Sequence, residues 1–88
     1  MATLRKQLEA LGFQRTTLGG NLVGYRRNVL TLMGGSAYIL TDAEDVTRLP
    51  TYRGNIALEL WDESAGECLA GFQDRPANVV TFLRSLMR

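Results

Sequence analysis

The chain has 88 residues, of which 45% are hydrophobic and 22% are charged, and its formal net charge is +1. This length supports one hydrophobic core and a single domain over residues 1–88, and the composition argues against disorder and a coiled coil. Histidine is absent and Cys68 is the single cysteine, which excludes an internal disulfide, a thiolate zinc site and histidine-based catalysis.

The N-terminal segment has the apolar spacing of an amphipathic helix, carried by Leu4, Leu8 and Leu11. Thr3 is a candidate N-cap, and Gly12 is placed to take the left-handed conformation that ends a helix. The pattern predicts a helix over residues 3–11 and, further on, a loop over residues 16–20.

The period then changes to two, which is typical of β-strands, and predicts strands over residues 22–26, 29–33 and 36–40. Gly34-Gly35 indicates a two-residue hairpin turn, because both residues tolerate positive φ. This turn would place Leu32 opposite Ala37 and Leu30 opposite Ile39.

A second tight turn is predicted at Arg27-Asn28, and it would place Tyr25 opposite Leu30. Arginine fits positive φ poorly, so this turn is less well supported by its residues. A slip of one residue would exchange the two faces of the sheet.

The second half of the chain begins with Thr41 and Glu44 at capping-box spacing, which predicts a short helix over residues 42–48. Alternating apolar residues predict a strand over residues 56–61, and a turn-rich segment leads to a return strand over residues 67–72. Asp74 and Pro76 then favour the start of a helix that continues to the C-terminus.

The order α-β-β-β-short α-β-β-α predicts an α+β fold, because the strands occur in runs instead of alternating with helices. We expect a two-layer sandwich in which an antiparallel five-stranded sheet carries the N- and C-terminal helices on one face.

Two groups of carboxylates are candidates for a metal site or a catalytic pair. Asp42, Glu44 and Asp45 lie at a predicted helix start, where capping explains them better than a metal site. The acidic residues near Asp62 lie in a predicted turn without signs of burial, so we expect a solvated turn instead of a catalytic pair. The sequence predicts no catalytic, cofactor-binding or metal-binding residue, and a protein that is not an enzyme.

Two helices cannot cover both faces of one sheet, so the sequence predicts an apolar outer face that is available to a partner. The candidate protein-binding residues are Val29, Met33, Tyr38, Leu40 and Trp61. The competing interpretation is that the segment 42–54 covers these side chains.

A cluster of cations and aromatic residues supports an alternative function, nucleic-acid binding. Its candidate residues are Tyr25, Arg26, Arg27, Arg48, Tyr52 and Arg53. The near-neutral net charge argues against this alternative.

The function that these patterns favour is a small non-enzymatic protein-binding or regulatory module, which acts on another protein or on a second copy of itself. The absence of a secretory signal and of a long apolar stretch predicts a cytoplasmic protein without a membrane partner. The preference for arginine over lysine suggests a bacterial or phage accessory protein.

Overall fold

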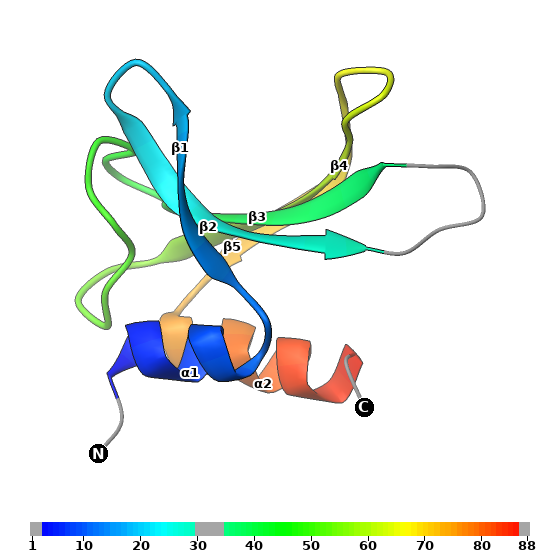
Figure 1. The fold of residues 1–88 in the computed structure, drawn as a ribbon. Coiled ribbons are helices and arrows are strands. Elements are labelled where there is room, and N and C mark those ends of the chain that lie inside the picture. Colours follow the sequence, from blue (N-terminus) through cyan, green and yellow to red (C-terminus); the bar gives the residue numbers. More distant parts are fainter. Residues whose placement is uncertain (1–2, 30–34, 87–88) are drawn as a thin grey trace.

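The structure is a computed structural model that describes residues 3–29 and 35–86 as a five-stranded antiparallel sheet with two helices. In chain order the elements are α1 (Leu4–Ala10), β1 (Gln14–Gly19), β2 (Leu22–Val29), β3 (Ser36–Asp42), β4 (Ile56–Asp62), β5 (Glu67–Asp74) and α2 (Pro76–Leu86). The strands lie side by side in chain order, and both helices lie on the same side of the sheet (Figure 1). The predicted α+β class is confirmed. Within the described residues, neither helix has the length and apolar character needed to cross a membrane.

Helix α1 begins and ends where the sequence predicts. The Thr3 hydroxyl accepts a hydrogen bond from the Lys6 N–H at 3.2 Å, which is the expected N-cap contact. At the other end Gly12 has a φ of 87°, and the Phe13 N–H donates to the Leu8 carbonyl oxygen at 2.9 Å. This arrangement is a Schellman-type stop, and it directs Phe13 into the core.

Residues 14–19 form strand β1, so the predicted loop over residues 16–20 is wrong. The strand pairs antiparallel with β2, with Thr16 opposite Gly24. Gly19 and Gly20 make the connection with φ values of 115° and 54°, which glycine adopts at little cost. The β-branched side chains of Thr16 and Thr17 favour the extended backbone that precedes this turn.

Strand β2 continues through Arg27 and Asn28 to Val29, so the predicted turn at Arg27-Asn28 is wrong, and so is the start of a separate strand at Val29. β2 pairs directly with β3, with Arg26 opposite Ile39 and Asn28 opposite Ala37. The predicted pairing of Ile39 with Leu30 and of Ala37 with Leu32 is therefore wrong as well. Residues 30–33 of the predicted second strand, and Gly34 of the predicted turn, lie outside the described residues.

This register decides which side chains reach the core. Tyr25, Leu40 and Leu58 lie in one row across β2, β3 and β4, and only 2%, 0% and 3% of their surfaces are exposed. The other buried members of the core are Leu4, Leu8, Phe13, Ile56, Val79, Val80 and Leu83. The core therefore lies between the helices and one face of the sheet, where each fully buried leucine contributes about 2 kcal/mol.

The connection between β3 and β4 consists of turns, so the predicted short helix over residues 42–48 is wrong. The Asp42 carboxylate accepts the backbone N–H groups of Glu44 and Asp45 at 2.9 and 3.0 Å, instead of the Thr41 hydroxyl acting as cap. The Arg48 Nε also donates to Asp42, at 2.9 Å. These bonds hold the start of the segment in a turn directly after β3.

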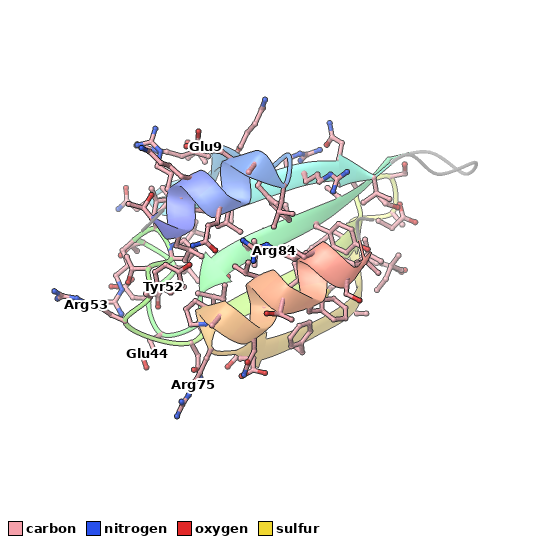
Figure 2. All side chains as sticks on the ribbon, turned by 90° about the horizontal axis from the view of Figure 1, so that it is seen from below. Glu9, Glu44, Tyr52, Arg53, Arg75 and Arg84 are labelled. Carbon is pink, nitrogen blue, oxygen red and sulfur yellow. The ribbon has the colours of Figure 1, made fainter. Side chains whose placement is uncertain are left out.

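The second hairpin and the C-terminal helix agree with the sequence pattern. β4 pairs with β5 around the predicted turn, and α2 begins at Pro76. The Asp74 carboxylate accepts the Arg75 N–H at 2.7 Å and the Asn78 side-chain amide at 3.1 Å. Helix α2 lies beside α1, and the Arg84 guanidinium donates to the Gln7 amide oxygen at 3.5 Å (Figure 2).

Candidate functional site

The sheet face opposite the helices, called the outer face below, presents a second set of side chains. Strand residues point alternately to the two faces, so the neighbours of the core residues point outward. Two rows cross the outer face: Arg26, Ile39 and Glu59 in one, and Ala37 and Trp61 in the other. Ala37 and Ile39 are buried although no helix covers them, which shows that neighbouring side chains fold over the middle of this face.

A groove of about 550 Å³ lies on the outer face. Its lining combines apolar and polar side chains: Leu18, Leu22, Ile39, Val46 and Trp61 with Thr16, Thr17, Arg26, Thr41, Glu59 and Glu63. A second hollow of about 460 Å³ over β4 and β5 shares Thr41, Val46 and Glu59 with the groove. The groove volume falls in the range of small-ligand and side-chain pockets, and its mixed lining is typical of binding sites.

One wall of the groove comes from the segment between β3 and β4, which curves along one end of the sheet (Figure 1). The Val46 carbonyl oxygen accepts the Val23 N–H at 2.9 Å, and the Ala43 N–H donates to the Asn55 carbonyl oxygen at 3.1 Å. The Asp42 contacts described above fix the start of the same segment. Val46 is therefore held against the sheet while 41% of its surface stays exposed.

An ion pair crosses the outer face at the far side of the groove. Both guanidinium nitrogens of Arg26 contact the Glu63 carboxylate, and the Arg26 Nε donates to the Asn28 amide oxygen at 3.0 Å. Arg26 lies on β2 and Glu63 follows β4, so the pair spans the intervening strand β3. Each charge is satisfied by its partner, which leaves little net charge at this wall.

Glu59 has a different environment in the same groove. Its Oε2 accepts a hydrogen bond from the Cys68 thiol at 3.4 Å, and the described residues supply no cation in ion-pair contact with it. Desolvation raises the pKa of the Cys68 thiol, and the Glu59 hydrogen bond and charge raise it further. The thiol is therefore protonated and a poor nucleophile near neutral pH, and it brings no countercharge to Glu59.

The structure separates the candidate protein-binding residues. Trp61 is half-buried and lines the groove on the outer face. Leu40 and Tyr38 lie on the helix side instead, Leu40 fully buried and Tyr38 packed against the core, so their predicted outward placement is wrong. The predicted partner of β3 is the segment 29–33, whereas the observed partner is β2, and this change of partner exchanges the two faces. Val29 pairs with Ser36, two residues along from the pair of Arg27 with Tyr38, so it shares the helix side of the sheet with Tyr38 and its predicted outward placement is also wrong. Met33 lies outside the described residues.

The candidate nucleic-acid residues do not form one surface. Tyr25 is buried in the core, Arg26 is on the outer face, and Arg27 approaches Gly12 on the helix side. Arg48 is paired with Asp42. Tyr52 and Arg53 lie in the loop before β4, near Arg75 at the start of α2 (Figure 2).

Of the groove lining, sequence reasoning singled out only Arg26 and Trp61, and it missed Glu59 and the apolar residues Leu18, Leu22 and Val46. Leu18 lies in the segment predicted as a loop, and its alternation with the threonines before it was the available signal. Val46 lies in the segment predicted as a short helix, and the sequence does not indicate which side chains it contacts. Their meeting depends on how two distant segments fold onto β2, which local patterns do not encode.

Comparison of the chain with known proteins found no matching family, no matching curated protein and no matching solved structure. The fold and the groove geometry therefore carry the functional argument.

Proposed function

We propose that this protein is a small non-enzymatic binding module that holds a segment of a partner protein in the outer-face groove. The observation that carries the proposal is the combination of Trp61 and the unneutralised Glu59 in one groove of about 550 Å³. Tryptophan is the commonest anchor of protein interfaces, because it buries a large surface with few rotatable bonds. The compartment we propose is the cytoplasm, where the exposed, unpaired Cys68 would stay reduced.

The charge of the groove indicates which side chain the partner contributes. Glu59 and Trp61 are two residues apart on β4 and therefore point to the same face. A carboxylate beside an aromatic ring favours a guanidinium or ammonium group, which can form an ion pair with one and a cation–π contact with the other. We therefore propose that the bound segment presents an arginine or lysine flanked by apolar residues, which would contact Leu18, Leu22 and Val46.

The test begins with selection of random peptides displayed on phage against the intact protein, followed by titration calorimetry with the selected peptides. We expect the selected sequences to share an arginine or lysine next to apolar residues. Trp61→Ala should weaken binding about thirtyfold, the equivalent of about 2 kcal/mol for an anchor residue. Glu59→Gln should weaken binding about tenfold, and the affinity of this variant should depend less on salt.

Matched controls replace the same kinds of side chain outside the groove. Tyr52→Ala removes an aromatic side chain that is 48% exposed in a loop, and Glu9→Gln removes a carboxylate from α1. Both controls should bind like the unmodified protein. Peptides that bind Trp61→Ala and the unmodified protein equally would contradict the groove assignment, and peptides without a shared cation would contradict the role of Glu59.

A further inference from the structure

Strand β5 has one edge without a strand partner. It is the last strand of the sheet and pairs with β4 on one side only, so the N–H and C=O groups of its other edge are available for pairing. Every residue of β5 from Glu67 to Gln73 is exposed. A strand of eight residues that is exposed along nearly its whole length is unusual in a stable monomer.

Apolar side chains gather at the same edge. The rings of Phe72 and Phe82 are in edge-to-face contact, 5.1 Å between centroids, yet 39% and 44% of the two residues stay exposed. Leu86 lies one helical turn beyond Phe82 and is 48% exposed, and Leu69 on β5 is 55% exposed. The β5 edge and the flank of α2 therefore form one apolar surface, called the β5–α2 edge below, which lies away from the groove.

The two edge strands of the sheet differ in the features that normally prevent pairing. β1 carries Arg15 and the polar side chains of Thr16 and Thr17. β5 carries no charge between Glu67 and Asp74, and it contains no proline or lysine. Both edge strands have an irregular register, β1 between Thr17 and Gly19 and β5 at Leu69, so the protection that β1 has and β5 lacks is the charge inside the strand.

We infer that β5 pairs antiparallel with β5 of a second copy of this chain, so that two sheets join into one continuous sheet in a symmetric homodimer. A two-fold axis perpendicular to the sheet reverses the strand direction and keeps all helices on one side. The apolar flank of α2 in one copy then approaches the same flank in the other. The interaction surface is self-complementary, as an isologous interface requires.

Charge supports a second copy as the occupant. Antiparallel pairing brings the start of one β5, with Glu67, toward the end of the other, where Arg75 projects from the N-terminal end of α2 (Figure 2). The uncharged middle of the strand meets itself, so no like charges are buried. The Asp74 carboxylate is already bound by the Arg75 N–H and the Asn78 amide.

The size of the β5–α2 edge sets the expected affinity of the dimer. Eight strand residues at about 3.4 Å each give an edge about 27 Å long. With the helix layer beneath it, such an edge buries about 500 Å² per chain, or about 1,000 Å² in total, which is near the lower limit for a specific interface. The dimer should therefore form reversibly and weakly, with half-dissociation in the micromolar range.

Sedimentation velocity of the full chain over concentrations from low micromolar to submillimolar tests the inference. We expect the mean mass to rise from that of one chain toward that of two. Leu69→Lys and Phe82→Lys should each raise the dimer dissociation constant at least tenfold. Arg75→Glu should weaken the dimer, and adding Glu67→Arg to it should restore most of the loss, because opposite charges again meet at the strand ends.

Leu22→Lys is the matched control, because it places the same charge on a leucine that is 40% exposed in the groove. The control should dimerise like the unmodified chain, and circular dichroism should show that all variants remain folded. A mass that stays at one chain over the whole range overturns the inference. A dimer that Leu22→Lys weakens and Leu69→Lys and Phe82→Lys leave intact also overturns it, because the contact would then lie in the groove.

Discussion

Gly24 lies at the closest approach of two neighbouring strands. A Cβ added at this position would lie 2.5 Å from the Leu40 carbonyl oxygen, 3.2 Å from the Thr41 Cγ2 and 3.3 Å from the Leu18 Cδ1. A carbonyl oxygen of a paired strand has little room to move, so only glycine fits. The absent side chain also allows Leu18 and Thr41 to close over β2 and form part of the groove.

Gly24→Ala should therefore lower the free energy of unfolding by about 2 kcal/mol, since overpacking a fixed backbone contact costs about 1–3 kcal/mol. Urea denaturation measures the loss. The control is Gly54→Ala, where the nearest atoms to an added Cβ, those of the Glu44 carboxylate, are 3.9 Å away. Equal stability of the two variants would contradict the close contact between Gly24 and β3.

Asp42 is a buried carboxylate whose charge is bound by Arg48 and by two backbone N–H groups. Burial acts to raise its pKa, but the hydrogen bond from Arg48 and the backbone N–H groups of Glu44 and Asp45 outweigh burial, and the pKa lies below its ordinary value. A carboxylate with a lowered pKa in the folded state stabilises the fold above its unfolded pKa. This contribution is lost as pH falls through the lower, folded pKa.

Asp42→Asn keeps an oxygen that can accept the two N–H groups but removes the charge that Arg48 contacts. At pH 7 the variant should be less stable by about 1 kcal/mol, because the guanidinium is partly solvated. The difference between the two proteins should shrink as pH falls below the ordinary aspartate pKa of about 4 and vanish below the lower pKa of the folded state, where the native carboxylate becomes protonated. Denaturation at a series of pH values measures the difference in free energy of unfolding between the two proteins. A difference that is constant down to pH 2 would contradict the charged role of Asp42.

At the scale of the elements, local sequence signals are sufficient to predict where the helices begin, where α1 ends and how the second hairpin pairs. Gly12 ends α1, Asp74 contacts the first residues at the start of α2, and β4 and β5 pair as their alternation predicts. The first three strands could not be derived in the same way. Alternation identifies a strand but does not say which strand pairs with it, and β2 proved to be longer than its turn-like residues Arg27 and Asn28 indicate.

The position of each strand in the sheet predicts how fast its backbone amides exchange. β3 lies in the centre, with strand partners on both sides, whereas β1 is an edge with one partner. Hydrogen exchange followed by mass spectrometry should therefore find the backbone amides of β3 better protected than those of β1. Equal protection of β1 and β3 would contradict the strand order.

At the scale of the whole molecule, the groove and the β5–α2 edge occupy different parts of one sheet. A dimer through β5 would keep both outer faces on the same side of the continuous sheet, and both grooves would stay open. A partner with two cation-bearing segments could then occupy both grooves at once. The second binding event would be intramolecular, which raises the overall affinity without any new contact.

Only part of the predicted outer face agrees with the structure. Trp61 was assigned to the outer face because β4 is marked by clear alternation, and it lies there. Leu40 is predicted on the same face because its strand is paired with the segment 29–33 instead of with β2, but it lies in the core. The two residues have equally apolar side chains, so composition alone could not separate them.

The sequence by itself determined the class of the fold, the β4–β5 hairpin, both ends of α1 and the start of α2, because caps, turns and alternation act between residues that are close in the chain. Only the tertiary structure decided which face each strand residue occupies. A shift of one residue between β2 and β3 changes no local propensity but turns every side chain to the opposite side of the sheet. It also decided that Leu18, Val46 and Trp61, from three separate segments, meet around Glu59.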